Sequence, residues 1–194
     1  TSSRLPQGEW HPAAVLWVNL LSPSGADEEA LFETLALVIP ELVGIVQEYQ
    51  GHIIRRPSGL TAVFGAQTAH EDDAERAVHA ARRMLQHVND LAAQGEATIL
   101  LRLAVSYGDV VAGHIGSSAQ PEFVGTGEPM QMAQRLAELA PPGQVWVSES
   151  VQKAASHVFV FAPQPGEAAV WELVDVRSEP GLARGLPGAA PRLI

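Results

Sequence analysis

The chain has 194 residues, 46% of them hydrophobic, a length that fits one well-buried domain better than two. With 12 Lys and Arg against 22 Asp and Glu, its net charge of −10 opposes binding to nucleic acid and to anionic membrane surfaces. The lack of Cys excludes disulfides, thiol catalysis and Cys-ligated zinc, and no apolar run is long enough for a membrane span. We therefore expect a cytoplasmic protein without a nucleic-acid partner.

The chain begins with a stretch that has no hydrophobic periodicity, residues 1–12, which we expect to lead into a single domain over residues 13–176. The apolar run 13–21 is typical of a central strand buried on both faces. Apolar residues at helical spacing then predict a helix over residues 27–50. Pro40 should kink or divide this helix in its middle, because proline lacks a backbone donor and clashes with the preceding turn.

A β-hairpin is predicted next, over residues 51–65. Its turn is Pro57-Ser58-Gly59, since Pro fixes φ and Gly tolerates positive φ. Arg55 and Arg56, beside this turn, are interpreted as solvated or in contact with an acidic partner. Residues 72–93 then carry Ala, Val and Leu on one stripe, the pattern of an amphipathic helix packed on a sheet.

The second half of the chain predicts two strands, residues 98–107 and 110–115, joined by a turn at Gly108-Asp109 and followed by a loop at residues 116–121. A helix is predicted over residues 129–140. The remaining predicted elements are a strand at 145–147, a short helix at 148–155, edge strands at 158–161 and 169–174, and a flexible Pro- and Gly-rich tail at 177–194. This order predicts an α+β domain in which helices cover one face of a mostly antiparallel sheet.

Four segments of the chain form one set of motifs. They are Ile54–Gly65 (Ile-Arg-Arg-Pro-Ser-Gly-Leu-Thr-Ala-Val-Phe-Gly), Glu71–Val78, Leu101–Gly116 and Ala140–Val145. Together they resemble the catalytic domain of class III nucleotidyl cyclases, the adenylate and guanylate cyclases, whose hairpin reads Lys-Phe-Ile-Gly-Asp-Gly-Leu-Met-Ala-Val-Phe-Gly. The resemblance implies a ferredoxin-like core and a head-to-tail dimer with its sites between the subunits.

The resemblance also points to the two positions that bind divalent cations in the family, one Asp on the first strand and one Asp at the hairpin turn. In this chain they are Asn19 and Ser58. Because Mg²⁺ is a hard cation that carboxylates normally hold, we expect no metal cofactor, and Mg²⁺ or Mn²⁺ only if a partner supplies the carboxylates. Simpler roles stay open for both residues, since Asn19 can satisfy a neighbouring backbone group and Ser58 suits a turn.

Four further positions carry the family's nucleotide chemistry. The two that read the base are Ile54 and Val124, and such an apolar pair cannot hydrogen-bond a purine edge. The transition-state positions are Arg135, which is retained, and Gln131, a longer amide in place of Asn. Arg135 is equally compatible with an ordinary helix surface and with a phosphate or interface role. The seven His residues share no metal-ligand spacing.

Three functions are compatible with these residues. The first is a catalytically inactive pseudo-cyclase, acting in intracellular signalling as a regulatory or dimerisation module, in a homodimer or in a heterodimer with another cyclase domain. The second is the non-metal half of a heterodimeric or tandem nucleotidyl cyclase that makes cyclic AMP or GMP. The third is a sensor that binds a nucleotide or another small ligand, without turnover, in the cleft where the family binds its substrate.

Overall fold

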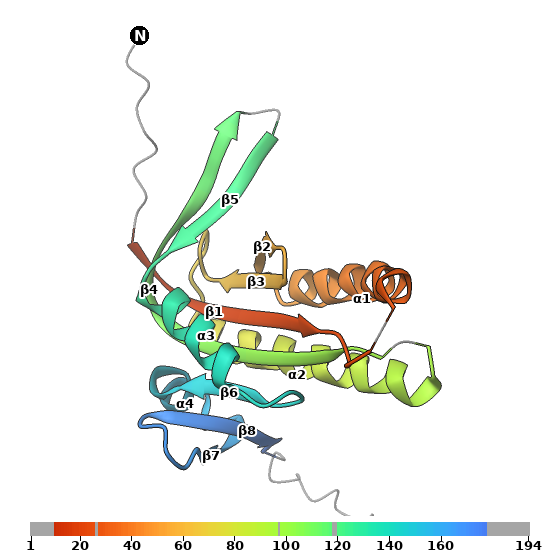
Figure 1. Cartoon of the computed structure of the whole chain (residues 1–194). Coiled ribbons are helices and arrows are strands. Elements are labelled where there is room, and N and C mark those ends of the chain that lie inside the picture. Colours follow the sequence, from red (N-terminus) through yellow and green to blue (C-terminus); the bar gives the residue numbers. More distant parts are fainter. Residues whose placement is uncertain (1–9, 26, 97, 118–119, 178–194) are drawn as a thin grey trace, which may run out of the picture.

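The computed structural model describes residues 10–25, 27–96, 98–117 and 120–177. In these residues one sheet has the strand order β2-β3-β1-β4-β6-β8-β7, with β5 paired to β4 (Figure 1). Its pairs are antiparallel except for β4 with β6, so the predicted α+β class with a mostly antiparallel sheet is confirmed. The strands are β1 (Trp10–Leu21), β2 (His52–Arg56), β3 (Gly59–Phe64), β4 (Leu100–Ser117), β5 (Gln120–Thr126), β6 (Val145–Ser148), β7 (Phe159–Pro163) and β8 (Val170–Val176).

Strand β1 lies in the middle of the sheet, between β3 and β4. It begins at Trp10, three residues before the predicted start at Ala13, because Trp10 to Pro12 pair with residues 109–111 of β4. The side chains of residues 13–16 are fully buried, as expected for a strand covered on both faces. Because side chains alternate along a strand, even-numbered residues of β1 face one core and odd-numbered residues face another.

The helices divide between these two faces. Helices α1 (Glu28–Glu48), α2 (Asp73–Gln94) and α4 (Glu149–Ala155) pack on the even-numbered side of β1. Helix α3 (Glu128–Leu139) packs on the opposite side (Figure 1), where Leu136 and Ala137 contact Trp146 and Ala104. The prediction that helices cover one face was therefore wrong for α3, since periodicity marks the apolar stripe of a helix but not the sheet face that it meets.

The long strand β4 overturns the predicted hairpin at Gly108-Asp109. Both residues continue the strand and pair with Ala13 and Pro12 of β1, which keep this part of the chain extended. The actual hairpin joins β4 to β5, where the sequence predicted a loop at residues 116–121. The far ends of β4 and β5 project from the body of the molecule as a two-stranded arm (Figure 1).

Two smaller predictions also need correction. Helix α1 continues through Pro40, so the predicted division is wrong, whereas a kink stays a prediction. Pro40 lies exposed, where water can reach the carbonyl that loses its hydrogen-bond donor. Strand β8 lies between β6 and β7, so of the two predicted edge strands only β7 is at an edge. The predicted flexible tail, apart from Arg177, and most of the predicted lead-in lie outside the described residues. Among the helices in the described ranges, none is long and apolar enough to cross a membrane.

Candidate functional site

The turn between β2 and β3 lies directly against the end of β1. Leu20 donates its backbone N–H to the carbonyl of Ser58 at 3.1 Å, and Gly59 pairs with Asn19. Gly59 has φ +153°, and a Cβ there would lie 2.0 Å from the Val18 carbonyl oxygen, so this close approach requires glycine. The structure therefore brings Asn19 and Ser58, the two positions that the motifs single out, close together.

The guanidinium of Arg56 lies between these two side chains. Its Nη1 is 3.3 Å from Asn19 Oδ1 and 3.4 Å from Ser58 Oγ. Nη2 is also 3.3 Å from the same Asn19 oxygen. A protein cation thus occupies the space between the two positions that the motifs assign to metal binding.

The guanidinium of Arg56 also makes three shorter hydrogen bonds. Nη2 donates to the carbonyl of Val18 at 2.8 Å and to that of Leu60 at 3.0 Å, and Nε donates to Thr61 Oγ1 at 2.9 Å. The Trp17 ring stacks against the guanidinium, with 3.8 Å between its centroid and Cζ. Burial lowers the pKa of Arg56 to about 10, so the group is still a cation near neutral pH.

Sequence reasoning missed this role of Arg56 by treating it together with Arg55. Strand alternation could have separated the two, because Arg56 shares a sheet face with Ile54 and with the cross-strand neighbour Thr61, whereas Arg55 is exposed. On that face the β1 residues Trp17 and Asn19 are the nearest partners.

The residues at this site do not fit a pair of divalent cations. Neither Asn19 nor Ser58 supplies a carboxylate, and the Asn19 amide oxygen already accepts hydrogen bonds from Arg56 and from the Trp17 indole, the latter at 3.1 Å. In the described parts of the chain, no group of three or more His, Asp and Glu side chains is arranged to hold a metal ion. The positive guanidinium would also repel a cation placed beside it.

The two positions that the family resemblance assigns to base reading lie in apolar surroundings. Ile54 packs with Met130 and Ala112 against the core on the α3 side of the sheet. Val124 lies on β5 and lines a mainly apolar hollow of about 330 Å³ on the β4–β5 arm. Within the described residues, neither position presents a side chain that can hydrogen-bond a purine.

Arg135 and Gln131 lie one turn apart on α3, and both are exposed. The Arg135 side chain is 64% exposed, and its Nη2 is 3.3 Å from Glu167 Oε2. No ion pair or hydrogen bond found among the described side chains joins this pair to Asn19, Ser58 or Arg56. Both side chains therefore face solvent and make no polar contact with Arg56 or its partners among the described residues.

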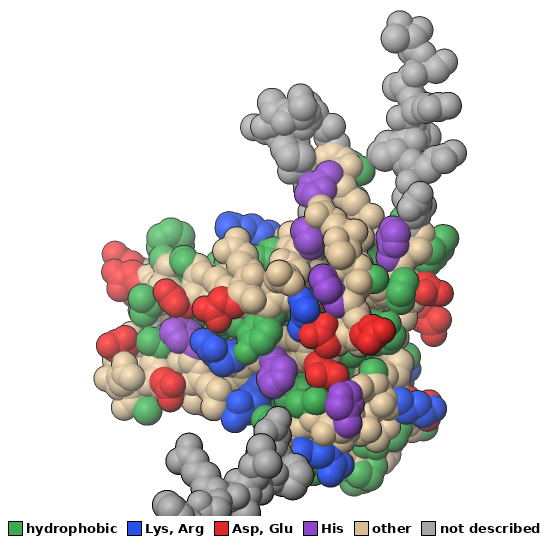
Figure 2. All heavy atoms as spheres, turned by 180° about the vertical axis from the view of Figure 1, so that it is seen from behind, with side chains coloured by type: hydrophobic (Ala, Val, Ile, Leu, Met, Phe, Trp, Pro, Cys, Tyr) green, Lys and Arg blue, Asp and Glu red, His purple; other side chains and the backbone are tan. Residues whose placement is uncertain are grey.

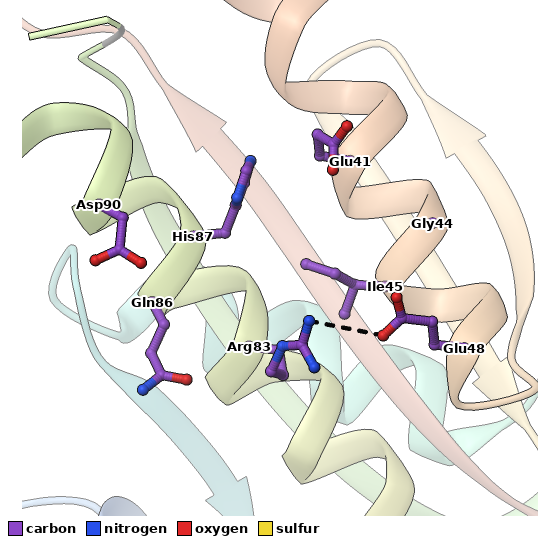
Figure 3. A pocket seen from close by; sticks show the side chains of 8 residues that line it. All are labelled: Glu41, Gly44, Ile45, Glu48, Arg83, Gln86, His87 and Asp90. Atoms are coloured by element: carbon purple, nitrogen blue, oxygen red, sulfur yellow. Dashed lines mark ion pairs between the residues drawn. The ribbon is translucent and has the colours of Figure 1, made fainter. Parts of the chain in front are cut away.

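A second hollow, of about 290 Å³, lies between α1 and α2 on the other face of the sheet (Figure 3). An ion pair of 3.7 Å between Arg83 and Glu48 lies at this hollow (Figure 3). His side chains are spread over the same side of the molecule (Figure 2). They form separate contacts, such as His157 with Glu75 at 2.9 Å, and none of the motif residues lies in this hollow.

Comparison with known proteins agrees with the fold and the motifs. Residues 57–170 match the family model described as the adenylate and guanylate cyclase catalytic domain. The uncharacterized protein Rv1319c of Mycobacterium tuberculosis is 28% identical over 156 residues, which are 77% of this chain. The uncharacterized protein Rv1318c of the same organism is 28% identical over 162 residues. The chain spans 28% of the length of each of these relatives.

Solved structures of cyclase domains share the fold at low sequence identity. The adenylyl cyclase CyaB from P. aeruginosa superposes with a TM-score of 0.76 at 18% identity, covering 90% of this chain and 100% of that one. A guanylyl cyclase domain of the RhoGC fusion protein from the fungus Blastocladiella emersonii, described as a non-canonical dimer, superposes with a TM-score of 0.77 at 18% identity, covering 87% of this chain and 99% of the fungal one.

Proposed function

The chain belongs to the adenylate and guanylate cyclase catalytic domain family, and on that premise we propose that it is a catalytically inactive member, a regulatory or dimerisation module in cytoplasmic signalling. One observation carries this proposal. Between the first-strand position Asn19 and the hairpin-turn position Ser58 lies the guanidinium of Arg56, with no carboxylate on either side.

Cyclisation requires the 3′ hydroxyl of a nucleoside triphosphate to attack its own α-phosphate. Divalent cations assist such phosphoryl chemistry by activating the nucleophile and by stabilising the charge on phosphorus and on the leaving pyrophosphate. At this site an incoming cation would meet two neutral oxygens and a fixed positive charge. Near a protein surface, repulsion between unit charges about 4 Å apart costs about 4 kcal/mol, and a divalent ion roughly doubles that cost.

A dimer is the expected working form. The family resemblance implies a head-to-tail pair, and the fungal RhoGC cyclase domain that shares this fold is described as a non-canonical dimer in one structure and as a monomer in two others. On this chain the large side chains Trp10, Ile115 and Leu139 are 64%, 46% and 45% exposed, respectively. Such exposed apolar side chains are available to a second copy or to another cyclase domain.

A second candidate function is the non-metal half of a heterodimeric or tandem cyclase. It is favoured by the exposure of Arg135 and Gln131 on one turn of α3, where a partner's nucleotide could reach them. It is opposed by Ile54 and Val124, because a half that donates the transition-state residues should also read the base.

The first test is thermal unfolding of the purified chain with ATP or GTP, each with Mg²⁺ or Mn²⁺, followed by product analysis of the same samples. We expect no cyclic nucleotide and no shift in melting temperature, since the site cannot hold the metal-bound triphosphate. A ligand at 100 times its Kd would stabilise the fold by about 2.7 kcal/mol, which such a measurement detects.

An active cyclase domain serves as the positive control in this test. Cyclic AMP or GMP from the chain alone would contradict the proposal. A melting shift without product would instead favour the third function, a nucleotide or small-ligand sensor.

A further inference from the structure

Every N–H group of the Arg56 guanidinium has an acceptor within the chain. A guanidinium carries five such donors. Four acceptors are side-chain or backbone oxygens of Asn19, Ser58, Val18 and Leu60 around the two terminal nitrogens, and the fifth is Thr61 Oγ1 at Nε. One face of the group is also covered by the Trp17 ring. No donor remains for a phosphate, so this arginine is not built to bind an anionic ligand.

The acceptors belong to three separate parts of the hairpin region. Val18 and Asn19 lie on β1, Ser58 lies in the turn, and Leu60 and Thr61 lie on β3. Two carbonyl oxygens, one amide oxygen and two hydroxyls thus surround a single positive charge. Hard cations prefer oxygen ligands of these kinds, so the guanidinium has the surroundings of a bound cation.

From this geometry we infer that Arg56 is a resident cation, which takes the place of divalent metal ions between β1 and the hairpin turn and excludes them from it. The inference deepens the proposed function and rests on it. The inactivity would then have two independent causes, namely the lost carboxylates and the inserted guanidinium. Restoring the carboxylates alone would not restore metal binding, because Arg56 would form ion pairs with both of them.

The decisive comparison uses three variants of the chain. The first carries Asn19→Asp and Ser58→Asp, the second adds Arg56→Ile, the residue of the family's hairpin motif, and the third instead adds Arg55→Ile as a matched control. Mn²⁺ binding is measured by titration calorimetry and by the Mn²⁺-dependent shift in melting temperature. We expect the variant with Arg56→Ile to bind Mn²⁺ more tightly than the other two, by about tenfold or more.

Equal Mn²⁺ affinity in the first two variants would overturn the inference, because Arg56 would then exclude nothing. The same holds if Arg55→Ile raises the affinity as much as Arg56→Ile does. If the Arg56→Ile variant is unfolded without metal, circular dichroism with added Mn²⁺ decides the matter. Refolding by Mn²⁺ supports exchange of one cation for another, and failure to refold contradicts it.

These outcomes are separable from failure of the proposed function. Cyclic nucleotide made by the unmodified chain would remove the inactivity on which the inference rests. If the unmodified chain makes no cyclic nucleotide and the first two variants bind Mn²⁺ equally, only the role of Arg56 is contradicted.

Discussion

Asn19 accepts hydrogen bonds from two neighbouring side chains, the indole of Trp17 and the guanidinium of Arg56. A backbone partner for this amide was one interpretation of the sequence, but its observed partners are side chains. Two residues apart on one strand, Trp17 and Asn19 share a face, and Arg56 reaches that face from a strand two positions away in the sheet. The amide oxygen at position 19 therefore serves as a hydrogen-bond acceptor for the arginine at position 56.

His79 offers a prediction at the residue scale, on pH dependence. Its ring stacks on that of Tyr49, with 5.9 Å between the ring centroids, and packs edge-to-face with that of Phe159, with 4.7 Å between the centroids. Burial lowers its pKa below the ordinary value of 6.5, an effect that Glu75 partly offsets and Arg82 reinforces. Below about pH 6.5 the unfolded chain therefore binds more protons than the folded chain, so stability present above this pH falls as the pH drops.

We expect the melting temperature to fall between about pH 7.5 and about pH 5.5, and to fall less in a His79→Phe variant, which keeps an aromatic ring but cannot titrate. The matched control is His114→Gln, at an exposed position on β4. An unchanged pH dependence in the His79→Phe variant would show that other groups cause it.

Among the elements, the β2–β3 hairpin positions the candidate site because it docks on β1. The docking depends on a turn that approaches the β1 backbone more closely than any side chain allows, at Gly59. The same hairpin carries Arg56 and Ser58, so its register places both groups beside Asn19. A shift of one residue would turn Arg56 to the other face of the sheet.

Gly59→Ala should strongly destabilise the chain, by about 2–4 kcal/mol, because the new methyl group would collide with the Val18 carbonyl in a backbone conformation that residues other than glycine rarely adopt. Gly95→Ala is the matched control. It also has a positive φ, +73°, but open space for a Cβ, so only about 1 kcal/mol of backbone strain is expected. Chemical denaturation of both variants measures the difference, and similar losses would contradict the predicted collision.

On the scale of the whole molecule, the question is whether this domain completes a site on another subunit. The relatives from Mycobacterium tuberculosis are longer than the chain, which spans 28% of each. The exposed pair on α3, Gln131 and Arg135, is the feature that a mixed dimer would use.

Mixing with a cyclase domain that keeps both carboxylates but lacks its own transition-state arginine separates the two candidate functions. If the chain is only regulatory, we expect no recovery of cyclase activity in the mixture. Recovery that Arg135→Ala abolishes, and that the neighbouring exposed control Gln134→Ala preserves, would establish the second function instead. Product formation at several mixing ratios is the measurement.

The sequence by itself determined the family, the α+β class, the β2–β3 hairpin and the absence of carboxylates at positions 19 and 58, because each depends on residue identity or local spacing. The two positions that the motifs single out, Asn19 and Ser58, lie close together in the structure, and their role stays a prediction. Only the tertiary structure decided that Gly108-Asp109 continues a strand, since pairing with β1 overrides local turn chemistry. The tertiary structure also decided that Arg56 fills the site, since its acceptors come from β1, the turn and β3 and become neighbours only when the sheet assembles.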